Sequence, residues 1–203
     1  MPIRTEDQAN VELEPHFAAL RELVAEAHAD FREQCRSIAH VLELGTRAAI
    51  YRDLIVRKLR AYCEATAGAQ FLRKDQLCLV GLENNWLVRV KRLRNGFAVG
   101  VSPTLASEQY DANELPDYAI SLLPDAPAAT LLYLGWAVPE NAPGEIESYL
   151  VCNDGNRAVL WAIRLSNPAP SRGIQEPLPI DDGGNEEPRR VTLKGSAKRR
   201  ANG

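Results

Sequence analysis

The stretch QLCLVGLENNWLVRVKRLRNGFAVGV, residues 76–101, decides the fold. Its apolar and polar residues alternate largely with a period of two, which is typical of strands that bury one face. The polar triplet at 83–85 and the pair Asn95-Gly96 interrupt this alternation, and Asn-Gly favours a type I′ hairpin turn. We therefore expect three antiparallel strands here, over 76–82, 86–94 and 97–101.

Three further strands are expected downstream, over 131–138, 146–152 and 157–165. Four prolines between 102 and 130 predict a connector with at most a short turn around 118–122. The last two strands are predicted to form a hairpin at Asp154-Gly155. With a two-residue loop, the facing pairs are expected to be Leu150 with Val159 and Ser148 with Trp161.

Upstream of residue 67 the apolar residues follow a helical period. They recur at steps of three and four, with Gln34 as the polar interruption. The members of this seam are Leu13, Phe17, Leu20, Val24, Ala27, Phe31, Ile38 and Val41. Pro15 fits a first helical turn and Gly45 follows a last one, so a long helix is expected over about 15–44. The seam either packs on the next helix of the same chain, which we favour, or joins two copies as a homodimer.

The next helix is expected over about 47–66, with Thr46 as its N-cap. Its five basic residues suggest a nucleic-acid surface as one alternative. Asp53 and Arg57 are four residues apart, as are Arg60 and Glu64, and this spacing favours ion pairs on a solvated face.

These elements predict an α+β fold, with a two-helix N-terminal unit packed on a mainly antiparallel sheet of about six strands. We expect one domain over 13–165, with its helical part at 13–66 and its sheet part at 70–165. A flexible N-terminus is expected over 1–12. Residues 166–203 hold five prolines and clusters of like charge, which predicts a disordered tail.

Charge is arranged in blocks along the chain, although the net charge is only −3. Residues 46–94 carry eleven basic and four acidic residues, whereas 1–44 and 95–165 each hold nine acidic residues. The near-neutral total excludes a polycation that coats nucleic acid. We call 46–94 the basic middle segment, and it is the expected surface for a partner.

Several chemistries are not expected. The three histidines are twelve residues apart, which places neighbours about 120° apart around a helix, so they cannot share one metal. The phosphate-binding, dinucleotide-binding, G-x-S-x-G and H-E-x-x-H motifs are absent, so neither a cofactor nor a catalytic residue is expected. The four cysteines form no CxxC pair, and no apolar run is long enough to cross a bilayer. With no signal peptide in the sequence, we expect a cytoplasmic protein with reduced thiols and no membrane partner.

The strand expected over 86–94 carries most of the candidate binding residues. Its alternation sends Trp86 into the core and Arg89 and Lys91 to an opposite, exposed face. The candidate partner- or phosphate-binding residues are Arg73, Lys74, Arg89, Lys91 and Arg94. The alternative is an edge strand whose charges prevent edge-to-edge pairing. Nucleases of the restriction type place an acid two residues before a Lys on a strand, but Arg89 occupies that position here.

The runs NNWLVRVKRLRNG (84–96), LLYLGW (131–136) and YLVCNDGNRAVLWAIRL (149–165) resemble parts of small uncharacterised bacterial proteins. Those proteins are encoded near repressor and metallopeptidase genes in mobile or stress-response loci. The resemblance covers about residues 45–165 and is carried by Trp, Gly and alternating aliphatic residues, so it transfers no catalytic residue. It implies a regulatory protein or an accessory of a toxin–antitoxin or defence-type locus.

Three functions follow, in order of preference. The first is a non-enzymatic cytoplasmic interaction protein that binds a protein partner through the basic middle segment. The second is a nucleic-acid-binding protein that uses the basic sheet face and the tail. The third is a metal-dependent nuclease-like enzyme. The chain is expected to be a monomer or a homodimer through its first helix.

Deleting residues 168–203 should leave the melting temperature nearly unchanged, because this segment has little apolar surface to bury. Thermal unfolding of the full and the shortened chain, followed by circular dichroism, measures the difference. A fall of more than a few degrees in the shortened chain would show that the tail stabilises the fold.

Overall fold

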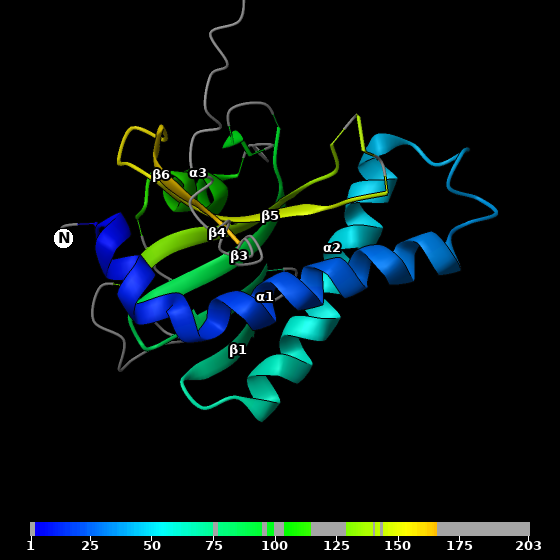
Figure 1. Cartoon of the computed structure of the whole chain (residues 1–203). Coiled ribbons are helices and arrows are strands. Elements are labelled where there is room, and N and C mark those ends of the chain that lie inside the picture. Colours follow the sequence, from blue (N-terminus) through cyan, green and yellow to red (C-terminus); the bar gives the residue numbers. More distant parts are fainter. Residues whose placement is uncertain are drawn as a thin grey trace, which may run out of the picture. The chain divides into compact units, whose positions relative to one another are not determined.

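Six strands form one sheet, and helices lie against both of its faces (Figure 1). Two long helices pack on one face and a short third helix packs on the other. In chain order the elements are α1 (Glu6–Gln34), α2 (Leu44–Ala65), β1 (Ala69–Lys74), β2 (Leu77–Leu82), β3 (Trp86–Arg92), α3 (Leu105–Asp111), β4 (Thr130–Ala137), β5 (Glu147–Asn153) and β6 (Val159–Arg164). The predicted α+β fold, with two N-terminal helices and a mainly antiparallel sheet, is confirmed.

The computed structural model describes residues 3–74, 77–94, 97–99, 104–114, 129–139, 141–142 and 144–165. All of them belong to one compact unit, Met1–Pro168. The turns expected at Asn95-Gly96 and around 118–122 lie outside the described residues, as does the tail expected over 166–203. None of the helices within the described ranges combines the length and the apolar character needed to cross a bilayer.

One parallel pairing sets the topology. The strands lie side by side in chain order, and neighbours are antiparallel except for β3 and β4. β3 and β4 run parallel, from Trp86 opposite Thr130 to Arg92 opposite Trp136. A tight turn cannot connect parallel neighbours, so the chain between them must cross over the sheet. α3 lies in this crossover and packs on the face opposite to α1 and α2.

The strand predicted over 97–101 does not form over its described part, 97–99. Val99 makes only an isolated antiparallel bridge to Leu93, and the Ala98 carbonyl oxygen accepts from the Arg94 N–H (2.8 Å). β4 occupies the position beside β3, so the expected meander ends there. The sixth strand is instead β1, where the sequence pattern predicts none, and α3 is a helix within the predicted connector.

α1 starts at Glu6, well before the predicted start near Pro15. The Thr5 hydroxyl accepts a hydrogen bond from the Gln8 N–H (3.3 Å), and the Gln8 side chain accepts one from the Thr5 N–H (3.0 Å). This capping box makes residues 6–12 helical, although they were expected to be flexible. Pro15 therefore lies inside the helix, where it removes one backbone donor, and the burial of Leu13 and His16 offsets that cost.

α1 also ends early, at Gln34, so its apolar seam is shorter than predicted. Ile38 and Val41 lie beyond the helix and are 46% and 66% exposed. α2 begins at Leu44 with Glu43 as its N-cap, so Gly45 falls in its first turn. The buried seam residues share one core with α2 and the sheet: Leu13, Leu20, Val24, Ala27 and Phe31.

The predicted register of the last hairpin is wrong. The Asp154 carboxylate accepts from the backbone N–H groups of Asn156 (2.9 Å) and Ala158 (2.8 Å). Arg157 takes a positive φ of 67°, and the connection extends from 154 to 158 rather than over two residues. The longer loop shifts the pairing, so that Leu150 faces Ile163 and Cys152 faces Trp161.

Two buried histidines tie α1 to α2 and to loops of the sheet. His16 Nδ1 lies 2.5 Å from the Tyr62 hydroxyl, and its Nε2 lies 3.0 Å from a Glu83 oxygen. His28 Nδ1 lies 2.7 Å from the Tyr51 hydroxyl, and its Nε2 lies 3.2 Å from the Gly144 carbonyl oxygen. A carbonyl oxygen only accepts, so Nε2 of His28 is the donor, and Nδ1 of the neutral ring accepts from Tyr51.

The neutral form of His28 predicts a loss of stability in acid. Burial lowers the pKa of His28 from its ordinary value, and the positive charge of Arg32 lowers it further, although the Gly144 carbonyl opposes the shift. The unfolded chain thus binds a proton at a higher pH than the native chain does, and native stability should fall as the pH drops below about 6.5. Urea unfolding midpoints at pH 8, 7, 6 and 5 measure this slope.

His28→Gln should flatten the slope, and His40→Gln, at an exposed position, is the control variant. Equal slopes in the His28→Gln variant and the parent protein would contradict this account.

Candidate functional site

The structure does not bring the five predicted binding residues together. Arg73 lies in β1 and lines a groove against α2, whereas Arg89 and Lys91 lie in β3 on the face that carries α3. Arg94 follows β3 and is exposed. Lys74 ends β1, and its side chain lies outside the described part of the structure. The predicted single cationic surface is therefore divided between two faces of the sheet.

Arg89 and Lys91 do not lie on an exposed face. β3 has neighbours on both sides, so the alternative of an edge strand is also wrong. The Arg89 guanidinium stacks over the Tyr110 ring (5.6 Å) and donates to the Ser107 hydroxyl (3.4 Å), and both partners belong to α3. Lys91 is half-buried. The crossover that carries α3 thus covers the basic residues that the pattern places in solvent.

A buried carboxylate explains why two positive charges occupy this face. Asp111 at the end of α3 is 2% exposed and accepts a short hydrogen bond from the Tyr133 hydroxyl. No described residue donates to its second oxygen. Burial raises the pKa of the Tyr133 phenol well above its ordinary value, and the Asp111 carboxylate adds to the rise. Lys91 interacts electrostatically with Asp111, and Arg89 interacts with the Tyr133 phenol that donates to it, so both place positive charge beside a buried acid.

The environment of Lys91 is unfavourable to its own charge. Burial lowers the pKa of Lys91 to about 8, and the nearby positive charge of Arg89 lowers it further. The negative charge of Asp111 acts in the opposite direction but does not cancel the shift. A phosphate-binding role for Arg89 and Lys91 remains a prediction from the sequence.

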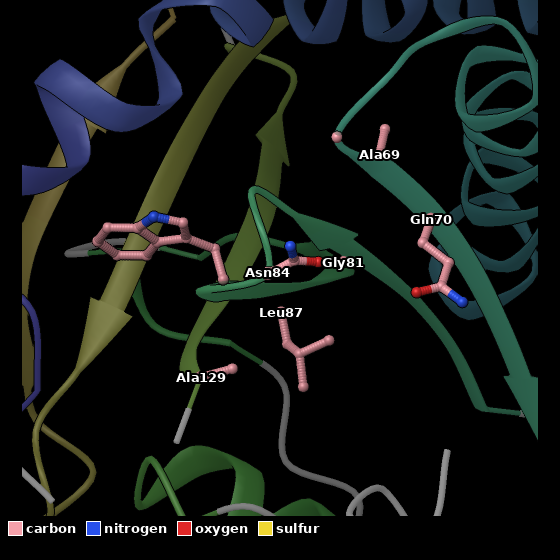
Figure 2. A pocket seen from close by; sticks show the side chains of 8 residues that line it. Ala69, Gln70, Gly81, Asn84, Leu87 and Ala129 are labelled. Atoms are coloured by element: carbon pink, nitrogen blue, oxygen red, sulfur yellow. The ribbon is translucent and has the colours of Figure 1, made fainter. Parts of the chain in front are cut away.

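A cavity of about 390 Å³ lies near the β2–β3 turn (Figure 2). Figure 2 shows Gln70 from β1, Gly81 and Leu87 from the β2–β3 hairpin, and Ala129 at the start of β4 around it. Gly68, Ala69, Asn84 and Trp86 complete the lining. None of these eight residues has an ionisable side chain, so the described lining of the cavity offers no acid, base or nucleophile for catalysis.

A basic groove between α2 and β1 is the stronger candidate. One cavity of about 490 Å³ is lined by residues of α2, β1 and β2, and a neighbouring cavity of about 480 Å³ is lined by α2 and β1. The two share Arg60, Phe71 and Arg73, so we treat them as one groove. We name it the arginine groove after its four arginines: Arg52, Arg57, Arg60 and Arg73.

Exposed ion pairs position three of these arginines. The predicted pair of Arg60 with Glu64 is present at 3.2 Å. Arg57 pairs with Asp30 of α1 at 3.2 Å instead of with Asp53, which pairs with Arg52. Such exposed pairs contribute roughly 0–1 kcal/mol each, so a carboxylate or phosphate ligand can replace them at little cost.

The sequence predicts only part of the arginine groove. Arg52, Arg57 and Arg60 fall within about 140° around the helix, which is a detectable signal for one shared side of α2. Arg73 reaches the same groove only because β1 packs beside α2, and β1 is the strand that the pattern does not predict. The ion-pair spacing along α2 also favours an interpretation in which the helix satisfies its own charges.

Comparisons with protein-family models, with curated proteins and with solved structures find no match to this chain. Within the described ranges, no group of three or more His, Cys, Asp or Glu side chains could hold a metal ion.

Replacing Lys91 with Met should stabilise the protein at pH 7, because burial and the charge of Arg89 disfavour the Lys91 charge by more than Asp111 favours it. We expect a rise of roughly 2–4 °C in melting temperature. The native pKa of about 8 lies below the ordinary value of 10.5, so the cost is complete below pH 8. The destabilisation by the Lys91 charge should disappear as the pH rises from 8 to 10.5, where the native lysine is neutral but the unfolded lysine is still charged.

Lys58→Met is the matched control, because Lys58 lies 3.0 Å from both Glu26 and Asp30 and should lose favourable ion pairs. The account of Lys91 is wrong if Lys91→Met lowers the melting temperature at pH 7 as much as Lys58→Met does.

Proposed function

We propose that this protein is a non-enzymatic regulatory protein that binds an acidic segment of a partner protein in the arginine groove. The observation that carries the proposal is the convergence of four arginines from α2 and β1 on one groove; among the described residues that line its first cavity, Asp53 is the only acid. Arginine binds carboxylates through two parallel hydrogen bonds, which gives both affinity and orientation.

A carboxylate-rich segment fits this groove better than a nucleic acid does. Duplex DNA carries one negative charge per roughly 1.7 Å of its axis, so it needs an extended basic surface. Glu64 lines the second cavity, and Glu26 and Asp30 of α1 lie beside Lys58 and Arg57 of α2. These acids would repel phosphates that extend beyond the four arginines, whereas a short acidic segment ends within the groove.

The proposal includes a cytoplasmic setting and a role as an accessory of a toxin–antitoxin or defence-type locus. The four cysteines are free thiols, which supports a reducing compartment. The accessory role is what the resemblance suggested by the sequence of residues 45–165 implies. Nucleic-acid binding through the same arginines is the second candidate function, and a nuclease-like activity is the third.

The test compares one groove variant with one control variant. The groove variant combines Arg57→Gln with Arg73→Gln, and the control combines Arg157→Gln with Arg164→Gln, which pair with Glu108 and Glu147 away from the groove. The probes are a fluorescein-labelled peptide of three alternating Glu-Val repeats and a labelled DNA duplex. Fluorescence anisotropy is measured with the full chain at two salt concentrations.

The groove variant should bind the peptide about tenfold or more weakly, while the control should stay within about twofold of the parent protein. Equal peptide affinities in both variants would overturn the proposal. Tighter binding of the duplex than of the peptide, lost in the groove variant and steeply dependent on salt, would establish the nucleic-acid function instead. Cleavage of the duplex with Mg²⁺ would establish the nuclease.

A further inference from the structure

The outer edge of the sheet runs along the arginine groove. β1 is the first strand in the sheet order, and no other described strand lies beyond it. Four of the six residues of β1 line the second cavity: Ala69, Gln70, Phe71 and Arg73. Successive residues of a strand alternate between its two faces, so a cavity that contacts three successive residues follows the edge of that strand. The groove therefore reaches the backbone of β1 as well as the arginines.

The hydrogen-bond pattern shows which residues of β1 point their backbone groups outward. The Glu83 N–H donates to the Gly68 carbonyl oxygen (2.8 Å), in register with the β1–β2 ladder. Hydrogen-bonded and non-hydrogen-bonded pairs alternate along an antiparallel ladder. Gln70 and Leu72 thus direct their N–H and C=O groups to β2, whereas Ala69 and Phe71 direct theirs to the outer edge. The Ala69 N–H donates to the Thr66 carbonyl oxygen (3.3 Å). The groups that remain for a ligand strand are therefore the Ala69 C=O and both the N–H and the C=O of Phe71.

The pleat of the sheet places the side chains of the outward-pointing residues of β1 on the same face as the arginines. Ala69 and Phe71 pack with the core on the α2 face, and Arg73 lines the groove on the same face. A strand added beside β1 continues the pleat, so every second side chain of that strand also lies on the α2 face. These alternate side chains would lie against Arg52, Arg57, Arg60 and Arg73.

We infer that β1 accepts an extended acidic segment of a partner protein as an added strand, with a carboxylate at every second position on the arginine groove. The inference rests on the proposed function and specifies the conformation of the partner. Main-chain pairing on an open edge supplies affinity, and alternate side chains supply specificity. A second copy of this chain is disfavoured on the same edge, because pairing β1 with β1 brings two sets of arginines together.

The experiment compares two labelled peptides of equal composition and charge, using the full chain. One is Glu-Val repeated three times, which spans about 20 Å and so matches the six residues of β1. The other is its block isomer, Glu-Glu-Glu-Val-Val-Val, which cannot place three carboxylates on one face of a strand. The alternating peptide should bind about tenfold or more tightly than the isomer.

Backbone N-methylation of the alternating peptide tests the main-chain pairing. In an antiparallel addition, the groove-facing residues form the hydrogen-bonded pairs, so methylation of the three Glu residues should abolish binding while methylation of the three Val residues is tolerated. A parallel addition predicts the reverse. Equal binding of both methylated peptides, or of the two isomers, overturns the added strand.

These failures differ from a failure of the proposed function. If the isomers bind equally but the groove variant Arg57→Gln/Arg73→Gln still weakens both, the groove binds acids without strand pairing. If that variant changes nothing, the groove itself is not the binding site.

Discussion

The parallel pairing of β3 with β4 is the constraint on which the rest of the structure depends. Because parallel neighbours require a crossover, the chain after β3 must pass over one face of the sheet before it returns as β4. α1 and α2 already cover the other face, so the crossover helix α3 buries the face that the pattern of β3 leaves polar. β3 and β4 thereby become the centre of the sheet, and β1 becomes an edge.

This arrangement divides the positive charge of the basic middle segment between two tasks. On the α3 face, Arg89 and Lys91 accompany the buried carboxylate of Asp111, and their charges act within the fold. On the α2 face, the arginine groove directs its positive charge outward beside an open strand edge. Proteins commonly protect such edges with charged residues. Here the arginines converge on one groove along the edge, an arrangement that suits an acidic ligand strand.

The sequence predicts those features that depend on local periodicity, and fails where distant segments compete. The change of period near residue 68 identifies the helical part and the sheet part, because both periods persist over many residues. The strand over 97–101 satisfies its local pattern, yet β4 from a distant part of the chain takes the place beside β3. The predicted start of α1 rests on the preference of Pro15 for a first turn alone, whereas the capping box at Thr5 and Gln8 starts the helix at Glu6.

In the candidate site, too, local features are predictable from the sequence, whereas contacts between distant segments are not. The alternation of β3 correctly places Arg89 and Lys91 opposite Trp86, but it contains no information on what covers their face. Three arginines of the groove are visible on one side of α2, whereas Arg73 requires the packing of β1 beside that helix. All four arginines of the groove belong to the basic middle segment. Of the five predicted binding residues, Arg73 alone is among the described residues that line it.

Amide hydrogen exchange at Phe71, followed by NMR with and without saturating Glu-Val repeat peptide, tests the central claim most directly. The account predicts fast exchange at Phe71 and slow exchange at Gln70 and Leu72 in the protein alone, because only the amides of the latter two point toward β2. With the peptide bound, the Phe71 amide should become protected. Protection of Phe71 without peptide, or fast exchange at Phe71 when the peptide is bound, would contradict the account.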